Sequence, residues 1–270
     1  MKLTVKDFRG IMESIAPPIL KEDYDNVGLM VGYSNQEVTS ILVALDCTLE
    51  VIEEAEEKGC NLILTHHPLL FITPKSITNE TLQGEKIIKL IKNNISLYSA
   101  HTNLDSVQGG LNDYVAEAIG IKNPKIINKI ESNFVEGKHG IGRIGRLEEN
   151  ISLNELCNKV KEVFNIECLR ITGDLDREIS KVAIINGSGQ DLFHKAKNLG
   201  AQCIITGDTT YHFVSDFKEE EICIIDPGHF GTEWPAMKQL KDVLRAKLEM
   251  KGYDGKIYLS QRCEDPYKYI

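Results

Sequence analysis

The sequence predicts an α/β fold made of two similar three-layer α/β/α units related by internal duplication, and it leaves open whether the units intertwine. Short apolar runs alternate with amphipathic helical patterns along the chain. The runs are almost continuously apolar, which is typical of parallel strands covered by helices on both faces. The 270 residues, 42% hydrophobic and 26% charged, are enough for two globular units.

The first half of the chain begins with a helix and a turn-rich segment and continues as alternating strands and helices. Thr4 is expected to cap the first helix, which Pro17 and Pro18 end. Residues 21–32 are interpreted as turn-rich. Strands are expected at residues 40–46, 61–65 and 95–100, and further helices at 48–58, 84–93 and 111–119.

The second half repeats this alternation after a segment with little periodicity, residues 121–139, which is interpreted as a connector. Strands are expected at residues 141–147, 167–172, 181–186, 202–206 and 222–226, and helices at 153–164, 191–199 and 234–250. We therefore expect a first unit at residues 1–125 and a second at 126–270. The position of the boundary, and whether the C-terminal helix packs on the first unit, stay open.

A sequence repeat supports the duplication. The strand at Ile41 and the Thr65 that ends the next strand have counterparts at Val182 and Thr206. The offset is constant, since 182 − 41 and 206 − 65 both equal 141. The alternative is that two unrelated strand-helix-strand units look alike.

Charge, hydropathy and cysteine content exclude several classes of protein. The 31 basic and 40 acidic residues give a net charge of −9, which disfavours a nucleic-acid partner. The sequence contains no apolar stretch of about 18 residues, so no membrane span is expected. The N-terminus does not resemble a signal peptide. The seven cysteines are odd in number and none are at Cys-x-x-Cys spacing, so we expect free thiols and a cytoplasmic location.

Metal-competent side chains gather where the predicted strands end. In open α/β sheets, ligands bind beyond the carboxyl ends of the strands. Reading those ends in order gives Asp46, His66 with His67, His101 with Asp105, Asp208, and Asp226 with His229 and Glu233. Imidazole and carboxylate are usual ligands of zinc, manganese and iron.

The adjacent histidines favour two metal ions over one. Neighbouring side chains on extended backbone point to opposite sides, so His66 and His67 each suit a different ion. The alternative is that one is packed at the strand end and the other faces solvent. For Glu233, the alternative is a carboxylate that stabilises a helix N-terminus.

Four stretches together resemble the Nif-three-like family of dinuclear metal-binding proteins, known as GTP cyclohydrolase I type 2 homologs. They are Asp-Asn-Val-Gly-Leu-Met-Val-Gly at 25–32, Thr-His-His-Pro at 65–68, Ala-His-Thr-Asn-Leu-Asp at 100–105 and Gly-His-Phe-Gly-Thr-Glu at 228–233. The chain resembles the short form, which lacks an inserted domain. Where the family often has Trp before Asp-Asn, this chain has Tyr24.

The resemblance implies a ligand set and an activity. His67 and Asp105 would hold one metal ion, His66 and His229 the other, and Glu233 would bridge them. The implied reaction is hydrolytic opening of the GTP purine ring with release of formate, in a homohexamer. Two closely spaced metal ions can lower the pKa of a shared water toward neutrality.

Two further residues are candidates for proton transfer, and each has a simpler interpretation. His101 would line the site. The alternative is that it supports the proposed ligand Asp105 without binding the metal itself. Asp208 replaces a histidine of the repeat, and its alternative is to cap a turn.

The residues alone give little support to GTP as substrate. The sequence has no Gly-x-x-x-x-Gly-Lys-Ser/Thr loop. Residues 140–145 fit Gly-x-Gly-x-x-Gly, but their alternation predicts a strand, and Arg143 and Arg146 are left as candidates to face phosphate. Two hypotheses follow: a metal-dependent hydrolase of GTP, a related nucleotide or a phosphoester, or a metal-holding assembly or regulatory protein without turnover.

Overall fold

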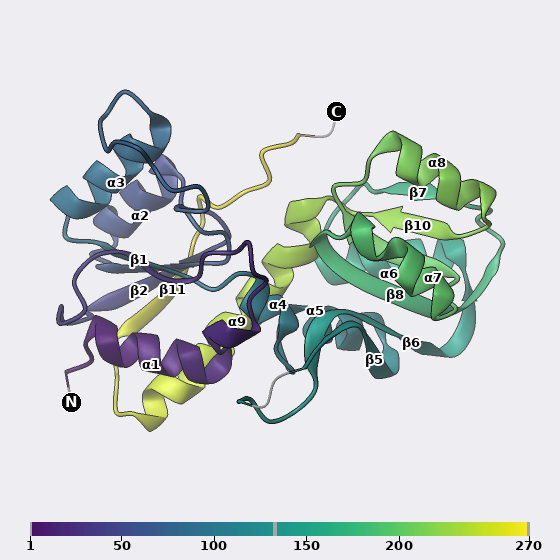
Figure 1. Ribbon diagram of the computed structural model, residues 1–270, viewed down its shortest axis with the longest axis horizontal. Coiled ribbons are helices and arrows are strands. Elements are labelled where there is room, and N and C mark those ends of the chain that lie inside the picture. Colours follow the sequence, from purple (N-terminus) through teal and green to yellow (C-terminus); the bar gives the residue numbers. More distant parts are fainter. Residues whose placement is uncertain (1, 132–133, 269–270) are drawn as a thin grey trace. The chain divides into compact units, whose positions relative to one another are not determined.

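The computed structural model describes residues 2–131 and 134–268, which divide into two compact units. One unit combines Met1–Leu104 with Met237–Glu264, and the other combines Asp105–Ala236 with Asp265–Ile270. The first unit is therefore built from both ends of the chain (Figure 1). A boundary at residue 125 was expected, with its position and the packing of the C-terminal helix left open. The C-terminal segment contributes part of a helix and a strand to the first unit.

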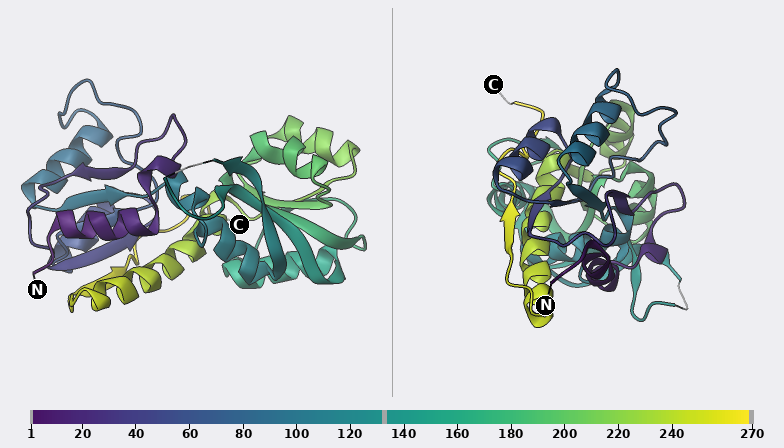
Figure 2. Two further views of the ribbon diagram at one scale, coloured as in Figure 1. Left: turned by 60° about the horizontal axis from the view of Figure 1, so that its bottom comes forward. Right: turned by 90° about the vertical axis from the view of Figure 1, so that its left-hand side faces the viewer.

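The first unit is a five-stranded sheet between two helical layers. Its strand order is β1-β4-β3-β2-β11, in which β1 is antiparallel to β4 and the other neighbours are parallel. Helices α2 and α3 cover one face, and α1 and the C-terminal part of α9 cover the other (Figures 1 and 2). The strands are β1 (Gly28–Val31), β2 (Ser40–Ala44), β3 (Leu62–Thr65), β4 (Ser96–Ser99) and β11 (Lys256–Leu259). The helices are α1 (Val5–Ile15), η1 (Pro18–Leu20), α2 (Leu49–Glu57), α3 (Leu82–Lys92) and α9 (His229–Met250).

The second unit is a six-stranded mixed sheet with the order β5-β6-β8-β9-β10-β7. Strands β8, β9 and β10 are parallel, and the other neighbours are antiparallel. Its strands are β5 (Ile121–Ile130), β6 (His139–Ser152), β7 (Arg170–Thr172), β8 (Glu178–Ser188), β9 (Cys203–Gly207) and β10 (Cys223–Asp226). Its helices are α5 (Leu111–Ile119), α6 (Leu153–Phe164), η2 (Gln190–Leu192), α7 (Phe193–Asn198) and α8 (Tyr211–Glu219), and α4 (Thr102–Ser106) lies at the boundary.

The predicted α/β class with two similar units is confirmed. The order β1-β4-β3-β2 of the first sheet matches β7-β10-β9-β8 of the second, with an antiparallel edge strand in each. Ile41 pairs with Leu62, and Val182 pairs with Cys203, so both partners are displaced by 141 residues (182 − 41 and 203 − 62). A shared strand order and register are what a duplication would leave.

Two sequence interpretations are wrong because edge strands carry weak patterns. Residues 121–130 form β5 rather than a connector, and residues 28–31 of the turn-rich segment form β1. Strand β5 lies at the edge of its sheet, and its residues 122–125 are exposed. The strand therefore lacks the alternation of apolar and polar residues.

Local signals at other positions act as expected. Thr4 and Asp7 form a reciprocal capping box at the start of α1. Phe8 of α1 packs edge-on against Tyr98 of β4, with ring centroids 5.7 Å apart.

All seven cysteines are free thiols. Within residues 2–131 and 134–268, no helix combines the length and the apolar character needed to cross a membrane.

Candidate metal centre

Three histidines converge at one edge of the first sheet. His66 and His67 follow β3, and His101 follows β4, its parallel neighbour. Because parallel strands end at the same edge, the three imidazoles meet there. Their ligand nitrogens all lie within 4.8 Å of one another. The convergence predicted for these residues is therefore present within the first unit.

Each of these rings is held by its Nδ1 atom against an acceptor oxygen, 2.8 Å away in all three cases. The pairs are His66 with the carbonyl oxygen of Ala100, His67 with Oδ1 of Asp46, and His101 with Oδ1 of Asp25. A carbonyl or carboxylate oxygen can only accept, so Nδ1 carries the proton of each ring. Nε2 is then the nitrogen suited to a metal ion, as in carboxylate–histidine–metal arrangements.

Asp25 is the most firmly held of these supporting groups. Its carboxylate is buried and also accepts hydrogen bonds from the backbone N–H and the hydroxyl of Thr102, at 3.0 and 2.5 Å. Burial alone would raise the pKa of Asp25, but the bonds from His101 and Thr102 outweigh it and lower the pKa to about 2. The sequence analysis interpreted residues 21–32 as turn-rich and did not predict this contact of Asp25 with His101.

A second set of ligands lies in the other unit, at the start of α9. His229 and Glu233 are one helical turn apart, with Nε2 of His229 3.0 Å from Oε2 of Glu233. The helix was expected to begin at residue 234, but it begins at His229 and contains Pro235 in its interior. Both ligands therefore project from one helix face.

Asp208 lies beside His229, its carboxylate Oδ2 2.7 Å from Nδ1 of the ring. It follows β9 in the left-handed conformation, with φ +51°. This contact repeats the arrangement of the three histidines in the first unit. The sequence analysis proposed Asp208 for proton transfer, and the structure places its carboxylate against the imidazole of His229.

A series of hydrogen bonds connects Asp105 to α9, the helix that carries His229 and Glu233. Asn112 of α5 donates from Nδ2 to the carbonyl oxygen of Asp105, at 3.2 Å, and accepts from the backbone N–H of Asn186, at 3.3 Å. The next residue of β8, Gly187, donates from its N–H to the hydroxyl of Thr232 in α9, at 3.0 Å. Sequence patterns gave no indication of this series of hydrogen bonds.

Gly187 leaves room for the Glu233 carboxylate. A Cβ atom at Gly187 would lie 2.2 Å from Oε1 of Glu233 and 3.3 Å from Cε1 of His229. The residue also has φ +58°, a conformation that side chains other than glycine rarely adopt. The close approach and the anchored imidazoles fit a site for a metal ion that prefers nitrogen and carboxylate ligands.

The profile of the family described as Duf34/NIF3 (NGG1p interacting factor 3) matches residues 3–266. The chain belongs to this family. It is 53% identical over 269 residues to a Clostridium acetobutylicum protein named GTP cyclohydrolase 1 type 2 homolog, and covers 100% of both chains. The resemblance seen in the sequence is therefore confirmed.

Solved structures show the same fold. A Bacillus cereus protein related to NIF3 superimposes with a TM-score of 0.93 at 26% identity, with 100% of both chains covered. Staphylococcus aureus protein SA1388 gives a TM-score of 0.91 at 31% identity, again with 100% coverage of both chains.

The space at Gly187 gives a direct test of metal binding in this NIF3 family member. We expect Gly187→Ala to displace the Glu233 carboxylate and to weaken divalent-metal binding by about 10- to 100-fold. Competition with a chromophoric chelator measures the affinity. Gly59→Ala is the matched control, because Gly59 also has positive φ, +66°, but nothing lies within 4 Å of its added Cβ. Equal metal affinity in the two variants would contradict the prediction.

Proposed function

We propose that this NIF3 family member is a metal-dependent hydrolase that binds two divalent cations per chain, either zinc, manganese or iron. The observation that carries the proposal is the anchoring at Nδ1 of the three proposed ligand imidazoles, His67 and His229 by carboxylates and His66 by a backbone carbonyl. Following the family resemblance, the proposed ligands are His66, His67, Asp105, His229 and Glu233.

The proposed substrate is GTP, whose purine ring would be opened by water with release of formate. The name of the Clostridium acetobutylicum relative, GTP cyclohydrolase 1 type 2 homolog, supports this choice. Two bound divalent cations supply Lewis acidity and lower the pKa of water. The protein's own part is to hold the imidazoles in one tautomer and to present a group that moves protons.

His101 is the proposed proton-transfer group. Asp25 accepts from its Nδ1, so Nε2 is the atom that would take up or release a proton at the substrate. Its side chain is 20% exposed, whereas the supporting Asp25 carboxylate is fully buried. Asp208 has the orienting role for His229 that Asp25 has for His101.

Removal of one ligand tests the proposal. Wild-type protein loaded with metal is expected to hold two ions per chain and to release formate from GTP. His67→Ala is expected to lose bound metal and to lower the rate of formate release at least about 100-fold. His212→Ala is the control, because His212 is exposed on α8 and lies outside the candidate groups.

The product released from the nucleotide distinguishes the proposed hydrolase from the alternative functions. Phosphate in place of formate would indicate a phosphoesterase acting on a nucleotide. No product from any nucleotide with two ions bound would favour a metal-holding assembly or regulatory protein instead.

By the same resemblance, we propose that the protein forms a homohexamer. From its cysteine content, we propose that it is located in the cytoplasm. The seven free cysteines support a reducing compartment. Light scattering would give an assembled mass six times the 30.3 kDa of one chain if the hexamer forms. A smaller mass at micromolar concentration would contradict it.

A further inference from the structure

Two exposed aromatic rings lie next to His101 in the first unit. Tyr24 is 67% exposed and Phe71 is 47% exposed. Their ring centroids are 6.3 Å apart at an interplanar angle of 67°, an edge-to-face contact. The ring of Phe71 is also 6.2 Å from the imidazole of His101, at 85°. We call Tyr24 and Phe71 the aromatic pair.

The loops that carry the aromatic pair are fixed to one another and to the candidate site. Asn26 donates from Nδ2 to the carbonyl oxygen of Leu70, at 2.8 Å, which links the residues next to Tyr24 and Phe71. Asp25 holds the Nδ1 atom of His101 at 2.8 Å. The side chain of Lys21 donates to the carbonyl oxygen of Asp25, also at 2.8 Å. The aromatic pair is therefore held in place beside His101.

The aromatic pair differs from a single exposed ring because its two rings contact each other beside polar residues. A large aromatic side chain stabilises a fold most when it is buried, as Phe8 and Tyr98 are in the same unit. Neighbouring exposed apolar groups beside polar residues often mark binding sites. Flat rings present a face on which another planar ring can stack without a specific hydrogen-bond pattern.

We propose that the aromatic pair binds the planar ring of the substrate, a purine or a similar heteroaromatic base, beside His101. This inference rests on the proposed function for the choice of a purine as the ring that is bound. It adds that substrate recognition depends on stacking in the first unit. Stacking on the aromatic pair would place the base next to the imidazole of His101.

Binding of the ring alone tests the inference. The probes are guanosine, which has the ring without phosphate, and ribose 5-phosphate, which has phosphate without the ring. Equilibrium dialysis uses the metal-loaded full chain. Guanosine is expected to bind and ribose 5-phosphate to bind far more weakly. Tyr24→Ala and Phe71→Ala are each expected to weaken guanosine binding about tenfold or more, and Tyr24→Trp to retain it.

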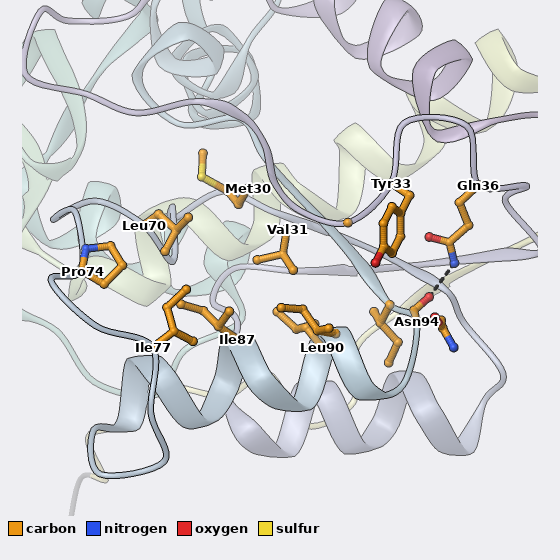
Figure 3. Close-up of a pocket in the computed structure, with 13 residues that line it drawn as sticks. Met30, Val31, Tyr33, Gln36, Leu70, Pro74, Ile77, Ile87, Leu90 and Asn94 are labelled. Carbon is orange, nitrogen blue, oxygen red and sulfur yellow. Dashed lines mark hydrogen bonds between the residues drawn. The ribbon is translucent and has the colours of Figure 1, made fainter.

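Tyr33 is the matched control. It is also 67% exposed and belongs to the same unit, but it lines an apolar cavity of about 330 Å³ with Val31 and Leu90 (Figure 3). Tyr33→Ala is expected to leave guanosine binding unchanged. Circular dichroism and metal content are expected to be the same in all variants, because the substituted rings are exposed.

The outcomes separate this inference from the proposed function. Failure of the wild-type protein to bind guanosine, or equal binding by Tyr24→Ala, Phe71→Ala and Tyr33→Ala, would overturn the inference even if GTP is hydrolysed. Binding that depends on the aromatic pair, without any turnover of nucleotides, would support the binding site and overturn the hydrolase.

Discussion

Asp113→Ala is expected to lower the free energy of unfolding by about 3–5 kcal/mol, because it leaves a buried guanidinium without its carboxylate. The side chain of Arg143 in β6 is 2% exposed. Its Nε and Nη2 atoms donate to the two carboxylate oxygens of Asp113 in α5, the second bond at 2.8 Å. The guanidinium also donates to the backbone carbonyls of Gly140, Gly142 and Val107.

A double variant distinguishes the destabilisation caused by an unpaired buried charge from the stabilisation that the ion pair itself contributes. Asp113→Leu combined with Arg143→Met removes both charges and keeps apolar volume, so it is expected to recover most of the lost stability. Urea unfolding followed by circular dichroism measures each variant. Glu117→Gln, an exposed site on the same helix, is the control and is expected to change stability by less than about 0.5 kcal/mol. A double variant no more stable than Asp113→Ala would contradict this account.

Arg143 also shows what a short motif leaves undetermined. It belongs to the Gly-x-Gly-x-x-Gly stretch, and the sequence left it as a candidate to face phosphate. The strand predicted from the alternation of this stretch is present as part of β6. The arginine points inward to a partner 30 residues earlier in the chain, which no local pattern could indicate.

The candidate ligands were predictable because two local rules act together. An apolar run predicts a buried strand, and parallel neighbours end at the same sheet edge, so His66, His67 and His101 had to meet. The start of α9 at His229 was not predictable in the same way, since Pro235 favoured a later start.

The groups that hold the histidines were not predictable from local patterns. Asp25 is 76 residues from His101, and Asp46 is 21 residues from His67. Each lies in a loop whose path depends on tertiary packing, so an aspartate after a strand looks the same whether it ends a turn or supports a ligand. Strand β11 was missed for a related reason, because it joins the sheet by pairing Lys256 with Ser40, far away in the chain.

A buried carboxylate fixes that late strand to the first unit. Glu54 of α2 is 2% exposed. It accepts hydrogen bonds from the hydroxyl of Ser260 and the backbone N–H groups of Gln261 and Arg262, directly after β11, and forms an ion pair with Lys58. Burial alone would raise the pKa of Glu54, but these bonds outweigh it and hold the pKa below its ordinary value of 4.5.

Glu54→Gln is therefore expected to destabilise the protein by about 3 kcal/mol at pH 7, since bonds to a charged acceptor are replaced by weaker ones. The lowered pKa means that the folded state binds the proton less readily than the unfolded chain. The stability that Glu54 contributes is thus fully present above pH 4.5 and is lost as the pH falls through its lower folded pKa. The difference between wild type and variant is expected to shrink over that range.

Urea unfolding at a series of pH values between 7 and 3 measures this difference. Glu50→Gln is the control, because Glu50 is exposed on the same helix, and its effect is expected to be small at every pH. Hydrogen exchange adds a local readout, since release of residues 260–262 is expected to speed exchange of the β11 amides that pair with β2. A stability difference that stays constant with pH would mean that the side-chain charge of Glu54 does not hold the C-terminal strand.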